Sequence, residues 1–579
     1  MHLIRRPVPV QTEWKLQQQG LPPLLARLYA ARGVADAVEL DDDPKNLLPP
    51  SALKGTGEAA ALLADALQAD AHIVIVADYD CDGATACALG LRALSAFIAA
   101  TASSARVDYL VPDRFTLGYG LTPAIVNLAA ARFQPDLLVT VDNGIASLEG
   151  VARARELGMA ILVTDHHLPA VFDGVVRLPE AECIVNPNQP ECTFPSKALA
   201  GVGVLFYVML ALRAELRARG AFGERPQPNL AQFLDLVALG TVADVVKLDR
   251  NNRVLVSQGL KRMREGKLTP GIAALLAATG RDPARLSTFD LGFILGPRVN
   301  AAGRLTDMGL GIECLATDDT GHAFNLAQKL EELNRERKAI EAGMQAQALA
   351  LLEAIDLTDA PLALSLYDPG WHQGVVGLLA ARVKERTHRP VFAFARGEKG
   401  ELKGSGRSIP RLHLRDALDL VSKRAPALLK RFGGHAAAAG VTLMEADFPE
   451  FQRRFAETVA ELLPPEALTR QLETDGSLEA AYCTLATARL LEAQIWGQGF
   501  PAPLFTDEFE VIRQRVFKGK VLKLDLQKGG QSLEAVQFNL VDAAEVPGTR
   551  VRLAYRLGIN DYRGKQSLQL VVEYLENLA

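Results

Sequence analysis

The chain has 579 residues, with 63 Lys and Arg against 68 Asp and Glu, so its formal net charge is -5. This length predicts about three or four domains, and a hydrophobic content of 49% excludes a wholly disordered chain. The slightly acidic balance excludes a globally basic nucleic-acid binder, but it permits a local basic groove on an acidic body.

The cysteines and the longest apolar run point away from a secreted or membrane protein. None of the six cysteines forms a C-x-x-C pair, so we expect reduced thiols. The run 198–212 is shorter than the roughly 20 residues that span a bilayer, and the N-terminus lacks the apolar stretch of a signal peptide. We therefore predict a buried helix at 198–212 and a cytoplasmic protein with no membrane partner.

The first half of the chain alternates between strand-like and helix-like segments. Residues 1 to about 50 are predicted to be helical. Short apolar runs at 72–77, 137–141 and 160–164 then alternate with Ala-rich stretches, and 107–111 is a further candidate strand. This rhythm is typical of a parallel sheet covered by helices on both faces.

Three different sequence patterns follow one another in the second half of the chain. Residues 322–355 have apolar side chains at the 3–4 spacing of one helix face, which predicts either a packed core helix or a rigid connector. A second α/β unit at about 361–461 contains three Gly-rich stretches. From about 472 onward, short alternating runs predict a small β-barrel.

Acidic residues follow the apolar runs of the first α/β unit. Asp78, Asp80 and Asp82 follow the first run, Asp142 the next, and Asp165, His166 and His167 the third, while Asp244 ends the apolar segment 235–244. Ligands bind outside the carboxyl ends of parallel strands, so we expect these groups to meet at one edge of the sheet.

Such a cluster would repel itself unless cations filled it. Carboxylates with imidazole and without thiolate suit Mn²⁺ or Mg²⁺. Five or six ligands exceed the need of one ion, so we predict two ions that share a bridging carboxylate.

Each motif has a plainer interpretation when taken alone. Residues 78–83 also begin like an EF-hand loop, but Leu89 stands where that loop needs Glu. Residues 142–144 alone would fit a turn, and 166–167 would fit a helix N-terminus. Only their combination favours a metal site.

The motifs resemble those of the DHH phosphoesterase superfamily. DYDCDG (78–83), VDNG (141–144), DHH (165–167) and ADVV (243–246) are similar to its four metal motifs, in the same order. PDRFTLGYG (112–120) and GPRVNAAGRL (296–305) resemble the RecJ family of bacterial single-strand-specific 5'-to-3' exonucleases. GSGRS (404–408) and GGHAAAAG (433–440) resemble the accessory DHHA1 domain, and the C-terminal part resembles the RecJ OB-fold.

The resemblance implies the fold class and the domain order. It predicts an α/β chain in which a parallel-sheet DHH core is joined by a long helix to a smaller α/β DHHA1 domain, with a C-terminal OB-fold barrel. The expected domains are a helical extension at 1–50, the DHH domain at 51–318, the connector at 319–356, DHHA1 at 357–465 and the OB-fold at 466–579.

The resemblance also implies roles at the metal site. Asp80 would bind one ion and Asp82 the other, Asp142 would bridge both, and His166 and Asp244 would complete the second site. Val76 stands where many members have a histidine, and Asp78 would be the substitute ligand. His167 would face the scissile phosphate, and Asp165 would orient a ligand.

The Gly-rich stretches of the second α/β unit predict a phosphate-binding site. Ser405, Arg407 and Ser408 lie in a segment expected to offer free backbone N–H groups. Gly434 and His435 precede an alanine run, so we expect a helix N-terminus facing an anion; the alternative for each stretch is a tight turn. Further candidates for nucleic-acid backbone contacts are Arg114, Arg298, Asn300 and Arg304.

A basic run in the C-terminal unit predicts single-strand binding. Its candidate residues are Arg513, Arg515, Phe517, Lys518 and Lys520, with Lys523 completing the run and Phe505, Tyr562 and Arg563 extending it. Basic grooves with stacking rings bind single strands without sequence preference, although a charge run is often only a solvated face.

The leading hypothesis is a single-stranded-DNA-specific 5'-to-3' exonuclease that releases mononucleotides by two-metal-ion hydrolysis in DNA repair and recombination. The resemblance further implies a single-strand-binding protein and a helicase as partners. One alternative is a DHH phosphoesterase acting on short oligoribonucleotides or cyclic dinucleotides. Another is an inactive single-strand-binding scaffold.

Overall fold

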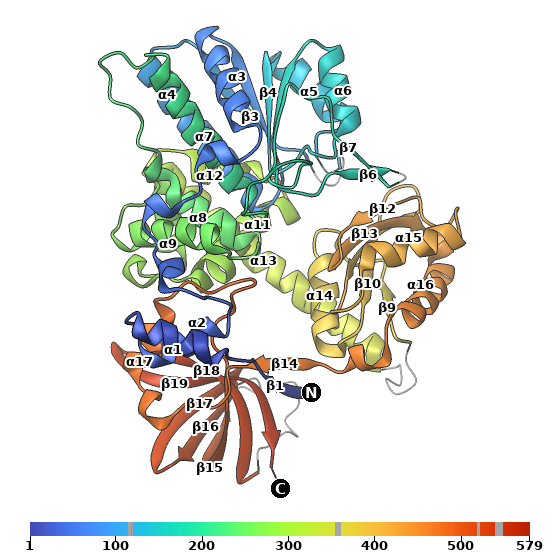
Figure 1. Ribbon diagram of the computed structural model, residues 1–579. Coiled ribbons are helices and arrows are strands. Elements are labelled where there is room, and N and C mark those ends of the chain that lie inside the picture. The colour runs from blue at the N-terminus through green and yellow to red at the C-terminus, as the bar shows by residue number, and fades with distance from the viewer. Residues whose placement is uncertain are drawn as a thin grey trace. The chain divides into compact units, whose positions relative to one another are not determined.

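The computed structural model describes residues 1–113, 117–118, 120–172, 174–353, 361–517, 521–538 and 548–578. The chain divides into two compact units (Figure 1). The smaller unit comprises Met1–Leu3, Ala301–Asp307 and Glu331–Leu472, and the larger unit comprises Ile4–Asn300, Met308–Leu330 and Glu473–Ala579.

A five-stranded parallel sheet forms the centre of the larger unit. Its strand order is β3-β2-β4-β5-β8, and every neighbouring pair is parallel. The strands are β2 (His72–Ala77), β3 (Arg106–Leu110), β4 (Leu137–Val141), β5 (Ala160–Thr164) and β8 (Cys183–Val185). The predicted parallel sheet is confirmed, including the strand expected near 107–111, whereas β8 was not predicted.

Helices cover both faces of this sheet (Figure 1). Val74 and Val76 of β2 pack with α5 (Pro123–Phe133) and α6 (Leu148–Glu156) on one face. Ile75 points to the other face, where Gly90 of α4 (Cys81–Thr101) leaves room for its side chain. The whole of β2 is buried, and a strand buried on both faces needs a continuous apolar run rather than an alternating one.

The second face carries α3 (Thr56–Gln68), α4 (Cys81–Thr101) and α7 (Gly201–Ala218). Helix α7 confirms the buried helix expected at 198–212. Within the described part of the chain, α4 alone is long and apolar enough to span a membrane, but 67% of its apolar stretch is buried inside the protein. That burial identifies α4 as a core helix.

The segment that ends at Asp244 is a helix and not a strand. Helix α8 spans Leu234–Ala243, and Asp244 is its C-cap. The prediction that each acidic group follows a strand is therefore wrong for Asp244. The segment is apolar and buried all round, so it has no periodicity that distinguishes a buried helix from a buried strand.

The smaller unit contains a five-stranded sheet of order β12-β13-β11-β10-β9. Only the β9–β10 pair is parallel. The strands are β9 (Leu364–Tyr367), β10 (Val391–Arg396), β11 (Glu401–Arg407), β12 (Arg431–Gly434) and β13 (Ala438–Met444).

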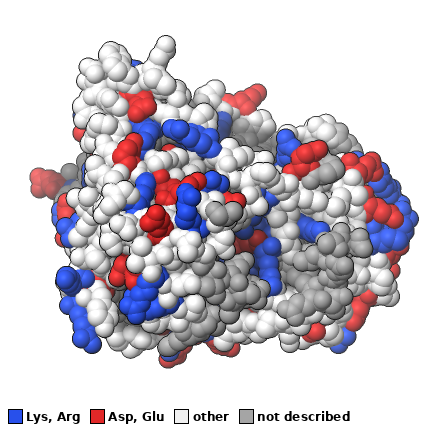
Figure 2. Space-filling view, turned by 90° about the horizontal axis from the view of Figure 1, so that it is seen from below, with Lys and Arg blue, Asp and Glu red and all other residues white. Residues whose placement is uncertain are grey.

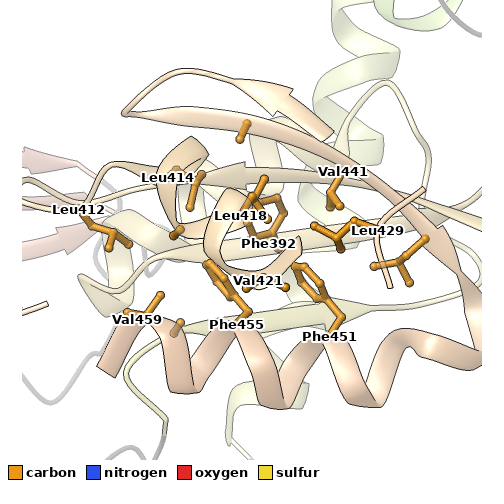
Figure 3. Close-up of a cluster of buried hydrophobic side chains, with 14 of the residues drawn as sticks. Phe392, Leu412, Leu414, Leu418, Val421, Leu429, Val441, Phe451, Phe455 and Val459 are labelled. Carbon is orange, nitrogen blue, oxygen red and sulfur yellow. The ribbon is translucent and has the colours of Figure 1, made fainter. Parts of the chain in front are cut away.

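Alternate residues of β10 pack on opposite faces of this sheet. Phe392 and Phe394 join the cluster that also contains residues of α15 (Leu414–Arg424) and α16 (Phe448–Leu462). Figure 3 shows this cluster, with Phe392 close to Phe451 and Phe455 of α16. Ala393 and Ala395 face α14 (Val376–Thr387) and two buried residues of the long helix α13 (Thr320–Glu353). The sheet thus has a helical layer on each side.

Two of the Gly-rich stretches of this unit are not the loops that we predicted. Residues 404–407 belong to β11 and pair on both sides, with β10 and with β13, so their backbone N–H groups serve the sheet. Gly433 and Gly434 end β12, and the alanine run leads into β13 instead of a helix. Gly434 has a φ of 140°, a conformation that side chains rarely adopt.

Helix α13 (Thr320–Glu353) is continuous and runs from the larger unit into the smaller one. In the larger unit Leu326 and Leu330 are buried, and in the smaller unit Met344 and Ala348 join the cluster around α14. Both interpretations of the segment 322–355 therefore apply, because the helix connects the units and packs into each.

A closed five-stranded barrel lies in the C-terminal part of the larger unit. The strand order is β15-β16-β17-β19-β18. The strands are β15 (Phe505–Phe517), β16 (Val521–Lys528), β17 (Gln531–Phe538), β18 (Arg550–Tyr562) and β19 (Lys565–Asn577). This barrel confirms the predicted OB-fold architecture.

The N-terminal segment packs near the chain that leads into the barrel. Arg32 donates to both carboxylate oxygens of Asp475 at 2.9 Å, and Tyr29 stacks on Phe500. The remaining helices and strands are β1 (His2–Arg5), α1 (Val10–Gln18), α2 (Pro23–Ala30), β6 (Ala170–Phe172), β7 (Val175–Arg177), α9 (Arg250–Arg264), α10 (Pro270–Thr279), the π-helix Asp290–Leu295, α11 (Gly296–Leu305), α12 (Gly309–Ala316), β14 (Gln471–Thr474) and α17 (Leu485–Glu492).

Candidate metal centre

The turn after β2 places Asp80 and Asp82 at the start of α4. Asp80 is the N-cap of this helix, and its Oδ1 accepts from the backbone N–H groups of Asp82 at 2.9 Å and Gly83 at 3.0 Å. An Asp at this position satisfies N–H groups that have no partner inside the helix. Because one oxygen makes both bonds, Oδ2 takes no part in the cap.

Asp82 is held by the N-terminus of a second helix, α7. Its oxygens accept from Gly201 N at 2.6 Å and from Val202 N at 2.9 Å. A Cβ at position 201 would lie 2.6 Å from the Cβ of Asp142, so only glycine fits there. Gly201 therefore allows α7 to approach the acidic cluster closely.

Asp142 directly follows β4 and is fully buried. Its φ of 63° is the left-handed conformation that residues other than glycine adopt uncommonly. Its Oδ1 lies 3.0 Å from Nε2 of His166, and neither atom has a hydrogen-bond partner among the described residues. Two buried, unpartnered ligand atoms that face each other are what a cation site requires.

His166 lies at the centre of the cluster. Its Nε2 is 3.5 Å from Oδ2 of Asp244 and 4.0 Å from Oδ2 of Asp82. The side chain of Asn188 donates to the backbone carbonyl of His166 at 2.6 Å, which anchors this segment. The structure thus brings the end of helix α8 to the same place as the strand ends.

Three groups of candidate ligands have their ligand atoms within 4.8 Å of one another. They are Asp78, Asp80 and Asp142; Asp82, His166 and Asp244; and Asp142, His166 and His167. Asp142 belongs to two of these groups. The predicted ligand residues are therefore all gathered, and the donor set of carboxylates and imidazole fits a hard divalent cation.

Burial and mutual repulsion disfavour the ionised carboxylates in the absence of cations. Burial and the charge of Asp80 raise the pKa of Asp82 to about 7. Burial together with neighbouring carboxylates also raises the pKa values of Asp78, Asp142 and Asp244 well above the ordinary range. Cations placed among these groups would remove that penalty.

The two histidines have opposite electrostatic environments. Burial, assisted by the charge of His167, lowers the pKa of His166 to about 4, so its ring is neutral and suited to bind a cation. Burial alone would lower the pKa of His167 as well, but its Nδ1 bonds Asp165 at 2.8 Å, and this contact raises the pKa to about 9. Asp165 therefore orients His167 and holds it protonated.

The predicted backbone-contact residues of helix α11 have local structural roles. Asn300 accepts from the backbone N–H of Cys81 at 2.8 Å and so ties α11 to the turn that carries Asp80. Arg298 donates to the carbonyl of Ile294 at 2.6 Å, and Arg304 donates to the carbonyl of Gly374 at 3.3 Å within the smaller unit. Arg114 lies outside the described residues.

In the smaller unit, Ser405 and Arg407 lie on β11 beside the first turn of α14. Arg407 donates to Ser405 Oγ at 3.1 Å and to the carbonyl of Gly406 at 2.8 Å. A Cβ at Gly377 would lie 3.0 Å from both side chains. Burial lowers the pKa of Arg407, and no carboxylate among the described residues forms an ion pair with it.

The other predicted phosphate contacts differ from expectation. Ser408 is buried, and its hydroxyl donates to the carbonyl of Leu412 at 2.8 Å, so it serves the fold. His435 lies in the turn between β12 and β13, where its Nδ1 accepts from Ala437 N. Because Ala438 is paired with Arg407, this turn lies at the same end of the sheet as Arg407.

The barrel presents part of the predicted single-strand surface. Arg513, Arg515 and Phe517 are exposed on β15, and the ammonium group of Lys523 lies over the ring of Phe517 at 5.9 Å. Lys518 and Lys520 lie outside the described residues. Figure 2 shows basic and acidic side chains mixed on the face seen from below, rather than one uniformly basic surface.

Phe505 and Tyr562, which were predicted to extend this surface, differ in exposure. Phe505 is fully buried in the barrel, so its predicted place on the surface is wrong. Tyr562 is 64% exposed, and the guanidinium of Arg563 lies 5.2 Å from its ring centroid.

Sequence reasoning missed the residues that position the ligands. Gly201 begins α7, and Asn188 follows β8, a strand that was not predicted. The signal for Asn188 is the same as for the acids, namely polar residues directly after a short apolar run. Asn143, which donates to the carbonyls of Val76 and Val141, completes this inner layer.

Three family models match the chain. They are the DHH family N-terminal domain at residues 72–241, the DHHA1 domain at 359–461 and the RecJ OB domain at 474–574. Together they cover more than half of the chain and include the parallel sheet, the smaller unit's sheet and the barrel.

Similar proteins carry one name. The single-stranded-DNA-specific exonuclease RecJ of Salmonella typhimurium is 51% identical over 566 residues, and that of Escherichia coli is 50% identical over 563 residues. Each alignment covers 96% of both chains. The crystal structure of Thermus thermophilus RecJ in complex with Mn²⁺ has a TM-score of 0.80 at 29% identity and covers 100% of this chain and 79% of that one. This chain therefore belongs to the RecJ family of single-stranded-DNA-specific exonucleases.

Proposed function

We propose that this chain is a single-stranded-DNA-specific exonuclease that hydrolyses phosphodiester bonds from the 5' end, releases mononucleotides and acts in DNA repair and recombination in the cytoplasm. The observation that carries the proposal is the cluster in which Asp142 and His166 present unpartnered buried atoms 3.0 Å apart. The 5'-to-3' polarity rests on the family resemblance.

The cluster would hold two divalent cations, Mn²⁺ or Mg²⁺. Asp78 and Asp80 would hold one, and Asp82, His166 and Asp244 the other. Asp142 would hold both, because it groups with Asp78 and Asp80 and its Oδ1 lies 3.0 Å from Nε2 of His166. Bound ions of this kind supply the Lewis acidity and the charge neutralisation that phosphodiester hydrolysis needs. Crystal structures of Thermus thermophilus RecJ with Mn²⁺ and with Mg²⁺ support this choice of metal.

His167 would contact the scissile phosphate. Its side chain is 44% exposed, and Asp165 keeps its pKa at about 9, so the imidazolium persists at neutral pH. A protonated ring of fixed orientation donates a charge-assisted hydrogen bond to a phosphate oxygen. Asp165 would thus act by positioning His167.

Ser405 and Arg407 would anchor the terminal phosphate of the strand. Arg407 has no carboxylate partner among the described residues, and its guanidinium matches phosphate geometry. The turn with Gly434 and His435 lies at the same end of the sheet and would add contacts. Fixing the terminus is what favours cleavage from an end over cleavage within a strand.

The barrel would bind the rest of the strand through Arg513, Arg515, Phe517 and Lys523. Basic side chains with an exposed ring suit single strands of any sequence. A single-strand-binding protein and a helicase are the protein partners that the family resemblance implies.

Digestion of end-labelled strands tests the proposal. The wild-type protein should release labelled mononucleotide at once from 5'-labelled single-stranded DNA with Mn²⁺ or Mg²⁺, and late from 3'-labelled strands. Duplex DNA, RNA and chelator-treated reactions should show little release. Degradation of duplex DNA at the same rate, or of single strands in chelator, would contradict it.

A matched pair of variants connects this activity to the cluster. Asp142→Asn should abolish release, whereas Asp65→Asn should leave it unchanged, because Asp65 is an exposed partner of Arg219 on α3. Circular dichroism checks that both variants fold.

A further inference from the structure

Two exposed phenylalanines stack on each other at the surface of the larger unit. The ring centroids of Phe289 and Phe293 lie 5.0 Å apart at an interplanar angle of 24°. Phe289 is 57% exposed and Phe293 69%. Large apolar side chains that are exposed together often mark a binding surface.

The pair lies on a rare backbone conformation. Phe289 precedes and Phe293 belongs to the π-helix Asp290–Leu295, whose opposite side buries Leu291 and Leu295 completely. Single π-helical turns are frequent at functional sites. The buried leucines fix the segment, so the two rings are presented on a rigid support.

This π-helix packs on the end of the helix that presents Asp244. A Cβ at Gly292 would lie 3.3 Å from Val242 Cγ1, and one at Gly296 would lie 3.0 Å from Ala243 Cβ. Ala243 is the last residue of α8, and Asp244 is its C-cap. The segment that carries the phenylalanine pair therefore packs on the last turn of α8, which ends at Asp244.

The segment before the pair is joined to the barrel. Arg285 forms an ion pair of 2.9 Å with Asp561 on β18. The adjacent Tyr562 is exposed at the end of that strand, with Arg563 over its ring. Exposed aromatic rings thus occur near both partners of this ion pair, Tyr562 next to Asp561 on the barrel hairpin and Phe289 shortly after Arg285.

We propose that Phe289 and Phe293 form a base-stacking platform for single-stranded DNA between the barrel and the metal centre. This inference rests on the proposed nuclease function and names two positioning residues for it. The occupant follows from continuity, because the segment is tied to the barrel through Arg285 and Asp561 and packs on the turn of α8 that ends at Asp244. A strand that reaches from the barrel to the acidic cluster would pass it. Every base has a ring face, so such stacking is tolerant of sequence.

The test uses paired substitutions and abasic strands. Phe289→Leu/Phe293→Leu keeps an apolar surface but removes the rings, whereas Phe289→Tyr/Phe293→Tyr retains them. Trp14→Leu, at an exposed aromatic residue of α1, is the matched control. Each full-length variant is titrated with a long fluorescent 5'-phosphorylated single strand in chelator, and KM and kcat are then measured with Mn²⁺.

The leucine pair should weaken strand binding and raise KM about tenfold with little change in kcat. The tyrosine pair and the Trp14 control should behave as wild type. When single abasic sites are moved along the strand, the wild type should lose affinity at one or two positions, and the leucine pair should show no further loss there.

The outcomes separate this inference from the nuclease proposal. Wild-type binding by the leucine pair, or an abasic penalty that persists in it, would overturn the platform, including the case in which the patch binds a protein instead. If the wild type cleaves no single strand, the nuclease proposal fails, while the titration in chelator still decides whether the rings bind the strand.

Discussion

The acidic cluster of the larger unit and the Arg407 site of the smaller unit are opposite solutions to the burial of charge. In the first, Asp82 and Asp142 are fully buried among other carboxylates. In the second, one guanidinium lies partly buried beside Ser405 with no ion-pair partner among the residues described. Each site has an excess of charge of one sign, negative in the first and positive in the second, which a ligand of the opposite sign would balance.

The difference lies in how each site can relax without its ligand. Carboxylates can take up protons, and burial raises the pKa of Asp82 to about 7. Arginine cannot lose its proton at any pH where the protein folds. Its charge must instead be solvated by fixed hydrogen bonds, here those that the guanidinium donates to Ser405 and to the carbonyl of Gly406. The metal site should therefore depend on pH, and the phosphate site should not.

The largest effect should come from removing one charge of the acidic cluster. Asp244→Asn should lower the rate of single-strand cleavage about 10³-fold, because a bound cation contributes several kcal/mol to the transition state. Single-turnover cleavage with saturating Mn²⁺ measures this. A rate within a few-fold of wild type would remove Asp244 from the metal site.

A smaller effect should come from the residue behind His167. Asp165→Asn should lower kcat about 10- to 100-fold. It should also move the alkaline limb of the kcat–pH profile from about pH 9 toward the ordinary histidine pKa. The reason is that His167 in the variant loses its proton at a lower pH. An unshifted alkaline limb would mean that Asp165 does not control the protonation of His167.

The Arg407 site should respond through substrate binding. Arg407→Met should raise KM for 5'-phosphorylated strands about 30-fold, the equivalent of one charge-assisted hydrogen bond. It should affect 5'-hydroxyl strands much less, and the ratio should be the same at pH 6 and pH 8. Arg431→Met, on strand β12 of the same sheet, is the control. Equal effects on both kinds of strand would contradict a phosphate contact.

The smallest effect concerns the protons of the acidic cluster. Mn²⁺ needs ionised carboxylates, so below about pH 7 binding must displace the proton of Asp82. The apparent affinity should then fall about tenfold per pH unit for each proton displaced, while His166 stays neutral because its pKa is about 4. Calorimetric titration in two buffers of different ionisation enthalpy counts the protons released, and zero release at pH 6 would contradict the coupling.

Prediction from the sequence succeeded for the parallel sheet and the acids at its edge. The runs that became β2, β4 and β5 are short and apolar throughout, as strands buried on both faces must be. The acids that follow them met as expected, because all carboxyl ends of a parallel sheet lie at one edge. The Arg407 site lacked such a rule, since its sheet is mostly antiparallel.

The failures have equally specific causes. Gly404 and Gly406 suggested a loop, but they are glycines because a Cβ at either position would lie 2.4 Å from the ring of Phe394 or Phe392. Strand β8 has only three residues, too few to show a pattern. Helix α8 is apolar on all sides, so nothing in its periodicity distinguished it from a strand.

By itself, the sequence determined the parallel sheet, the long helix, the barrel and the identity of the acidic groups, because these depend on local periodicity and on the direction of parallel strands. Only the tertiary structure decided how the groups are held. The N-terminus of α7 binds Asp82, and α8 brings Asp244 to His166 from outside the sheet. Such contacts join residues far apart in the chain, and close packing, not local pattern, selects them.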